Sequence, residues 1–148
     1  IRDSALTAAR TGWVISNDTR MDNSSFSVVD QQKLFRLIAL HEGQEASSGI
    51  IVGIEDIRIP REGELGDKRY GSFSVVVKRI HSSGLEEIER FDGCTLNPNS
   101  DKYVAKMIGD QYVEWSTSEK RNKLYGTHPN ISEYVRVGVF IAYNVFYR

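Results

Sequence analysis

The sequence has a single cysteine, Cys94, among 148 residues, so no disulfide can form within the chain. It also has no uninterrupted apolar run of membrane-spanning length, because Arg136, Gly138 and Asn144 break the most apolar stretch, residues 135–147. The first residues lack the hydrophobic core of a signal peptide. We therefore expect a globular domain that is not inserted in a membrane and is held together by its own hydrophobic core.

Net charge is nearly absent as well. The 19 Lys and Arg side chains almost balance the 20 Asp and Glu side chains, which leaves a formal net charge of −1. A protein that binds nucleic acid by neutralising phosphates needs a cationic surface. We therefore expect no nucleic-acid partner.

The usual motifs of catalytic and cofactor-binding proteins are missing. The sequence has no GxxxxGK[ST] or GxGxxG phosphate-binding loop. His41, His81 and His128 have no metal-ligand spacing and are interpreted as loop histidines. Cys94 has no flanking nucleophile motif and is interpreted as a small, semi-buried thiol. The sequence thus predicts no catalytic residue, no cofactor, no metal site and no enzymatic activity.

The sequence does contain an alternation of apolar and polar residues in several short runs rich in β-branched residues. These runs predict six strands, at residues 33–40, 49–59, 70–81, 85–91, 111–116 and 134–148, with a weaker signal at 12–15. The turn at residues 82–84 predicts a hairpin, with Glu86, Glu87 and Glu89 on its solvent face. The fold class predicted is a single α+β domain over residues 1–148, mostly antiparallel and β-sandwich-like, with one docking helix.

That helix is expected in the best-defined stretch, residues 91–110 (FDGCTLNPNSDKYVAKMIGD). Ser100 is predicted as its N-cap, followed by Asp101 at the positive end of the helix dipole. Gly109 is predicted to end the helix with a positive φ. Helical spacing places four residues on one apolar face: Tyr103, Val104, Met107 and Ile108.

Three segments, residues 34–60, 70–81 and 88–115, resemble the tail sheath proteins of contractile-tailed bacteriophages, and most closely the long subunits of large myophages. The family pattern F(D/E)-x-(C/L)-x-L-(N/D)-P-x-S-x-x-Y-(V/I)-x-x-x-I-G-D is matched within residues 91–110. The resemblance covers about residues 33–137. Its structural signature is Leu96, Pro98, Ser100, Tyr103, Val104, Ile108 and Gly109.

The resemblance implies a structural protein of the virion. Sheath subunits form six-fold rings, stacked helically around the tail tube, and a baseplate signal releases the contraction that drives the tube through the host envelope. The chain would be a β-sandwich domain cut from a longer subunit, which its start without Met and its apolar end also favour. It would be assembled in the host bacterial cytoplasm, contact other sheath subunits, and reach the tube and baseplate through the full-length protein. The isolated domain is expected to be monomeric.

Two charged segments, residues 61–68 and 119–123, are the candidate subunit-contact loops. Solvated loops are the simpler interpretation, but their charge density suits weak, exchangeable contacts. The candidate residues are Arg61, Glu62, Glu64, Asp67, Lys68, Lys120, Arg121 and Lys123.

A second hypothesis is a non-catalytic β-sandwich binding module on a virion surface. Such a module would recognise carbohydrate or protein through exposed aromatic side chains. Trp13, Tyr112 and Trp115 are the candidates.

Overall fold

The computed structural model describes residues 8–16, 27–41, 43 and 48–139. Within this part of the chain, eight strands form three antiparallel sheets. The first sheet has the order β1-β2-β8, with bounds Val14–Ile15, Lys33–Ala39 and Val135–Val139. The second has the order β3-β4-β5, with bounds Ile50–Arg58, Ser72–His81 and Gly84–Cys94. The third pairs β6 with β7, with bounds Tyr112–Ser116 and Arg121–Tyr125.

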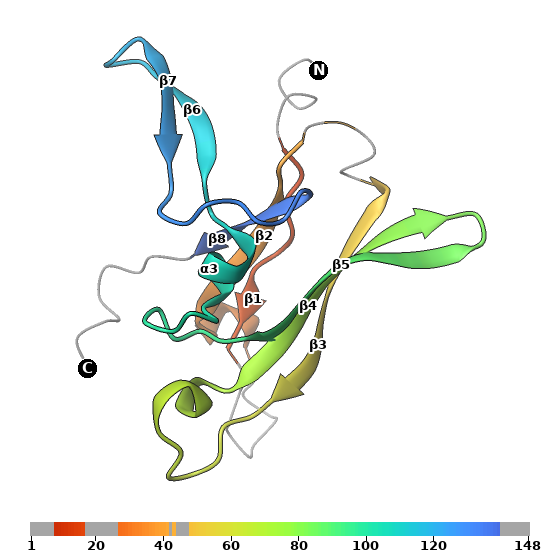
Figure 1. Cartoon of the computed structure of the whole chain (residues 1–148), viewed down its shortest axis with the longest axis vertical. Helices are drawn as coiled ribbons and strands as arrows, with labels where there is room; N and C mark the ends of the chain where they lie inside the picture. The colour runs from red at the N-terminus through yellow and green to blue at the C-terminus, as the bar shows by residue number, and fades with distance from the viewer. Residues whose placement is uncertain (1–7, 17–26, 42, 44–47, 140–148) are drawn as a thin grey trace.

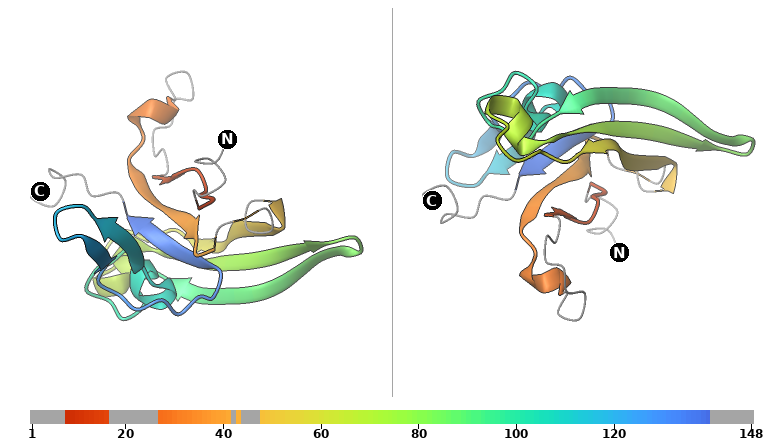
Figure 2. Two further views of the ribbon diagram at one scale, coloured as in Figure 1. Left: turned by 90° about the horizontal axis from the view of Figure 1, so that it is seen from above. Right: turned by 90° about the horizontal axis from the view of Figure 1, so that it is seen from below.

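The two three-stranded sheets share one hydrophobic core. Figure 2 shows β1 and β2 on one side of the molecule and β4 and β5 on the other. Alternate residues of a strand point to opposite faces, and here one set from each sheet faces inward. Helix α3, Val104–Ile108, packs into the same core. The buried core residues are Phe35, Leu37, Val75, Val77, Cys94, Val104, Ala105, Ile108, Val135 and Val137. The predicted fold class, a β-rich α+β domain, is confirmed.

The segment 117–126 contains residues 119–123, which the sequence predicts as a charged loop, and it differs from that prediction. Its second half is strand β7, which pairs with β6 so that Tyr112 lies opposite Tyr125 and Glu114 opposite Lys123. The two tyrosine rings stack with centroids 5.4 Å apart. Cross-strand pairs of this kind stabilise a hairpin whose strands carry many charges. The last predicted strand is present as β8, and its residues 140–148 lie outside the described part of the chain.

The helix is shorter than predicted, and Ser100 is not its N-cap. Helix α3 begins at Val104, and its capping position is Tyr103, whose backbone is not helical (φ −56°, ψ 131°). Residues 102–104 instead pair with Thr95, the residue that follows β5, because Thr95 N donates to Lys102 O (2.9 Å) and Val104 N donates to Thr95 O (3.0 Å). Backbone groups that are used in this pairing cannot form a first helical turn.

Ser100 stabilises the preceding turn. Its Oγ accepts from Lys102 N at 3.1 Å, and its carbonyl oxygen accepts from Tyr103 N at 3.1 Å. Ser and Asn side chains often bond to the backbone two residues further along in this way. The dipole role predicted for Asp101 is wrong for the same reason, since Asp101 lies outside the helix.

Gly109 ends α3 as predicted, with φ of +103°. Its carbonyl oxygen accepts from Val137 N at 2.8 Å, so the helix end runs along the free edge of β8. Two hairpins leave this body (Figure 1): β4–β5 extends to one side, and β6–β7 extends from one end.

Candidate functional site

The first candidate contact segment connects β3 to β4 and includes the 3₁₀ turn Gly66–Tyr70. Arg61, Glu62 and Lys68 are exposed, as a contact loop requires. Glu64 is used within the segment: it accepts from Arg61 N at 2.8 Å and pairs with Arg58. The bond from Arg61 N, with help from Arg58, lowers the pKa of the Glu64 carboxyl.

Asp67 holds this segment against the turn before α3. Its carboxylate accepts from Ser100 Oγ at 2.5 Å and from Asn97 Nδ2 at 2.7 Å. These two bonds, that from Ser100 first, lower the pKa of the Asp67 carboxyl. Two of the five candidate contact residues in this segment, Glu64 and Asp67, thus already have partners within the domain.

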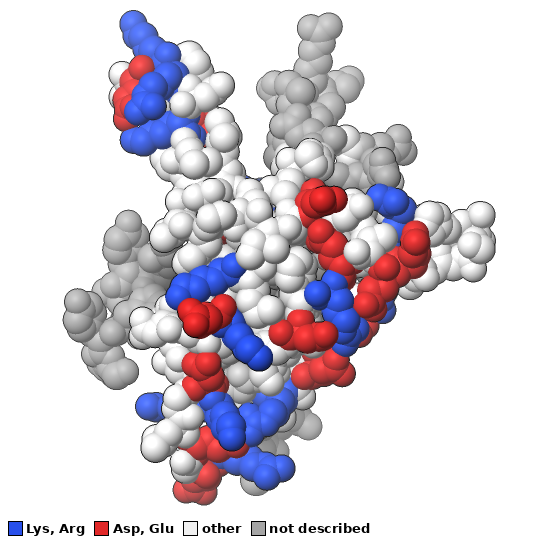
Figure 3. Space-filling view, viewed as in Figure 1, with Lys and Arg blue, Asp and Glu red and all other residues white. Residues whose placement is uncertain are grey.

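The second candidate segment is the tip of the β6–β7 hairpin, so Arg121 and Lys123 lie on a strand and not in a loop. Both pair with Glu119, through Arg121 Nε to Glu119 Oε2 (2.7 Å) and Lys123 Nζ to Glu119 Oε1 (2.8 Å). Lys120 occupies the turn with φ of +51° and is exposed. Figure 3 shows these side chains at the end of the hairpin, far from the charged segment 61–70 at the opposite end of the molecule. The structure therefore does not bring the two segments together.

The signature residues form the joint between the two sheets. Val104 and Ile108 are buried in the core, and Tyr103 and Leu96 pack against it. Ser100 is buried in the turn, whereas Pro98 is exposed there.

Asp110, the last residue of the signature pattern, ties this joint to a segment that is distant in the sequence. Its Oδ1 accepts from Thr127 N (3.0 Å) and His128 N (2.7 Å), and its Oδ2 lies 3.1 Å from His128 Nδ1. The pattern contains this aspartate, but nothing local in the sequence indicates partners 17 and 18 residues away.

A charge network that sequence reasoning missed covers the β3–β4–β5 sheet. Arg90 donates to Asp92 Oδ1 (2.7 Å) and Glu55 Oε2 (3.1 Å), and also pairs with Asp56 and Glu87. Figure 3 shows acidic and basic side chains alternating along this side of the molecule. Bonds from Lys78 and Arg90 lower the pKa of Glu55, and bonds from Ser74 and Arg90 lower that of Asp92.

The three glutamates of β5 do not share one environment. Glu86 and Glu87 are exposed as predicted, and Glu86 lies 2.6 Å from His81 Nε2. Glu89 differs, because it is only partly exposed and accepts from Ser132 Oγ (2.5 Å) and Glu133 N (2.9 Å). It thus fastens β5 to the segment that precedes β8.

Cys94 is fully buried, which raises the pKa of its thiol to about 11. A protonated, buried thiol is a poor nucleophile. Among the described residues, no group of three or more His, Cys, Asp and Glu is placed to hold a metal ion. In that same part of the chain, no helix has the length and apolar character needed to cross a membrane.

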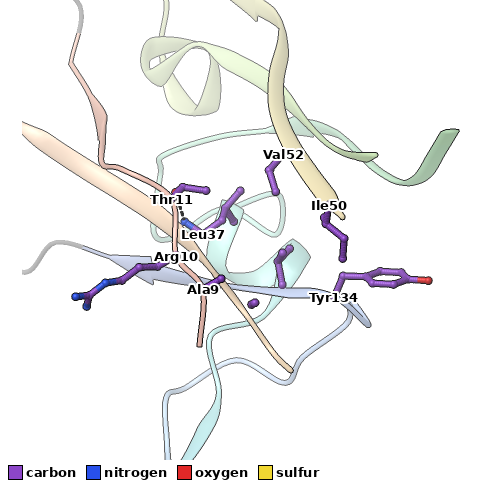
Figure 4. Close-up of a pocket in the computed structure, with 9 residues that line it drawn as sticks. Ala9, Arg10, Thr11, Leu37, Ile50, Val52 and Tyr134 are labelled. Atoms are coloured by element: carbon purple, nitrogen blue, oxygen red, sulfur yellow. Dashed lines mark hydrogen bonds between the residues drawn. The ribbon is translucent and has the colours of Figure 1, made fainter. Parts of the chain in front are cut away.

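Two small cavities lie between the layers. One of about 150 Å³ (Figure 4) is lined mainly by aliphatic side chains of β2, β3 and β8, including Leu37, Ile50 and Val52. The other, of about 280 Å³, lies beside Phe35, Tyr70 and Leu96. Both are smaller than the pockets of about 300–1,000 Å³ that bury small ligands.

The three aromatic candidates for a binding module do not form one platform. Tyr112 and Trp115 are three residues apart on β6 and so point to opposite faces. Trp115 is exposed beside Val113 and Leu124, whereas Tyr112 stacks on Tyr125. Trp13 is half-buried directly before strand β1, on a different part of the molecule, where Arg36 lies over its ring.

No protein-family model, curated protein or solved structure matches this chain. The resemblance to tail sheath proteins therefore stays a prediction that depends on the residues described above.

Proposed function

We propose that the chain is a non-catalytic structural domain of a contractile tail sheath subunit. In this proposal it forms part of the helical stack of six-fold rings in the phage tail, and its partners are other copies of the subunit. Contact with the tail tube and baseplate belongs to the full-length protein.

The observation that carries this proposal is the position of the signature segment. Residues 91–110 contribute Cys94, Val104 and Ile108 to the shared core and, through Gly109 and Asp110, hold residues 127–137 in place. Most of the matched residues thus serve internal packing and hydrogen bonding. This is the arrangement expected of a stiff block that moves as a rigid body when the interfaces between subunits repack.

Electron microscopy of negatively stained full-length protein tests the proposal. Tubes or rings with six-fold symmetry are expected. Discrete particles that bind glycans would contradict it and favour the binding module on a virion surface.

The contact role of the hairpin tip has its own test. Reversing the charges of Lys120, Arg121 and Lys123 to Glu should weaken assembly of the full-length protein, since charge complementarity guides such contacts. The same reversal at Arg61, Lys68 and Arg69, three exposed cations in and beside the first candidate segment, tests that segment separately. Unchanged assembly and contraction in the first variant would remove the hairpin tip from the proposal.

A further inference from the structure

A row of four side chains crosses the outer face of the β1–β2–β8 sheet. Arg36 lies opposite Gly138, and Arg136 lies opposite Ile38, so both arginines point away from the buried Leu37 and Val137. Trp13 lies on the β1 side of Arg36, with the guanidinium carbon 4.6 Å from the ring centroid. Tyr112 lies on the far side of Arg136 at 4.2 Å. We call Trp13, Arg36, Arg136 and Tyr112 the arginine–aromatic row.

The two arginines are diagonal neighbours on adjacent antiparallel strands, a relation in which long side chains can reach each other. Gly138 makes room for one of them: a Cβ added there would meet Arg36 Cγ at 3.5 Å and Ile38 Cδ1 at 3.0 Å. The Arg36 side chain therefore lies over the glycine.

Among the described residues, neither arginine of the row forms an ion pair with a carboxylate. The buried Arg36 Nε has no hydrogen-bond acceptor in that part of the chain. Asp110 and Glu114 are close enough to act on Arg136 without pairing with it, and Asp110 Oδ1 already accepts from Thr127 and His128.

This arrangement is unfavourable in the isolated chain. Burial, together with the charge of Arg36, lowers the pKa of Arg136. A buried N–H group without an acceptor costs free energy, and so do two like charges placed side by side. An acceptor with negative charge beside the two guanidinium groups would offset the repulsion between them.

The chemistry of that acceptor follows from the geometry. Each guanidinium carbon lies over an aromatic ring, and the fork of N–H groups of an arginine suits a planar, two-oxygen partner. A carboxylate has this shape. Nucleic acid is disfavoured, because a chain with a net charge of −1 has no excess of cations to neutralise a run of phosphates.

We propose that the arginine–aromatic row is a docking site for an acidic segment of another protein chain, with an Asp or Glu carboxylate placed between Arg36 and Arg136. The apolar part of that segment would contact Trp13 and Tyr112. This inference goes beyond the structural function proposed above and does not depend on it.

Fluorescence anisotropy with a fluorescein-labelled hexaglutamate peptide, at low ionic strength, tests the site. The double variant R36Q/R136Q should weaken binding about tenfold or more, because paired guanidinium–carboxylate contacts are lost. The matched variant R61Q/R69Q removes the same charge from an exposed segment and should change the affinity less than about twofold. Equal loss in both variants, or no peptide binding to the wild-type chain, would overturn the proposal.

Two further measurements separate the possible occupants. In ¹⁵N NMR of the wild-type chain, the Nε–Hε signals of Arg36 and Arg136 should shift saturably with the peptide, and those of Arg61 should not. This readout stands even if the double variant does not fold. The proposal fails if hexathymidylate or inorganic sulfate shifts these signals with an affinity equal to that of the peptide. Finally, R36K/R136K keeps the charge but loses the planar fork, and should bind more weakly than wild type.

Discussion

Gly109 occupies a backbone position that no other residue fits. Its φ of +103° disfavours L side chains, and an added Cβ would lie 2.4 Å from Asn130 Cα and 2.6 Å from Pro129 O. These atoms belong to the backbone, which cannot rotate out of the way as a side chain can. The sequence indicated this glycine as a helix stop, whereas the close approach of residues 129–130 is visible only in the structure.

We predict that Gly109→Ala lowers the free energy of unfolding by about 2–4 kcal/mol, as the sum of backbone strain and overpacking. The matched control is Gly63→Ala, where φ is +83° but nothing lies within 4 Å of the added Cβ. That variant should cost only about 1 kcal/mol. Urea denaturation followed by circular dichroism gives both values, and equal costs would show that the close approach does not matter.

Cys94 allows a second prediction at the scale of a single residue. Since burial raises the pKa of its thiol to about 11, very little thiolate is present at pH 8. Alkylation by iodoacetamide at pH 8 should be at least about 100-fold slower in the native chain than in 8 M urea. Mass spectrometry of the time course measures it. Native alkylation at the rate of a free thiol would contradict the buried position.

The β6–β7 hairpin has an apolar face that is exposed to solvent. One face presents Val113, Trp115 and Leu124, each more than half exposed, and the other is held by the stacked Tyr112 and Tyr125. A two-stranded sheet without cover on its apolar face is only marginally stable. Strand β4 lies between two partners and is buried at its centre, so the two elements should differ in stability.

We predict that backbone amides of β6 and β7 exchange with deuterium about tenfold or more faster than those of β4, measured by NMR at equal pH. Tyr125→Ala should make amide exchange in the hairpin faster still, because loss of a stacked aromatic pair costs about 0.5–1.5 kcal/mol of stability. Leu124→Ala, on the exposed face, is the control and should change little. Protection in the hairpin equal to that in β4 would indicate that another surface covers it.

At the scale of the whole molecule, stability against acid depends on carboxylates that hold separate elements together. Arg90 on β5 bonds to Glu55 on β3, and Asp67 joins the 61–70 segment to the turn before α3. The folded state lowers the pKa of Glu55, Asp67 and Asp92. A lowered pKa contributes stability above the unfolded value near pH 4 and loses it as the pH falls through the folded value.

We predict that the free energy of unfolding falls between about pH 5 and pH 3, and that Arg90→Gln reduces this fall. The variant should be less stable than wild type at pH 7, and the difference should shrink as the pH falls below about 4, because the lowered pKa values delay protonation in the folded state to lower pH. Arg69→Gln, in an exposed segment, serves as the control. Parallel pH profiles for wild type and Arg90→Gln would exclude the network as the cause.

The local patterns of the sequence were enough to predict most strands, the β-rich fold class, the apolar face of α3 and its stop at Gly109. These features depend on alternation, helical spacing and backbone preference, which each act over a few residues. The same local reasoning placed the helix start at Ser100, because local patterns do not show that Thr95 pairs with residues 102–104. It also predicted a loop at residues 121–125, because they do not show that β6 pairs with β7.

Tertiary structure alone decided which distant residues meet. Sheet register brings Arg36 beside Arg136, 100 positions apart, and loop packing brings Asp67 to Ser100 and Asp110 to His128. The sequence shows only that these side chains are charged, since an Arg or Asp is the same residue whether it faces solvent or a partner. Their roles follow from burial and from the partners that register supplies, and neither is encoded in the residues next to them.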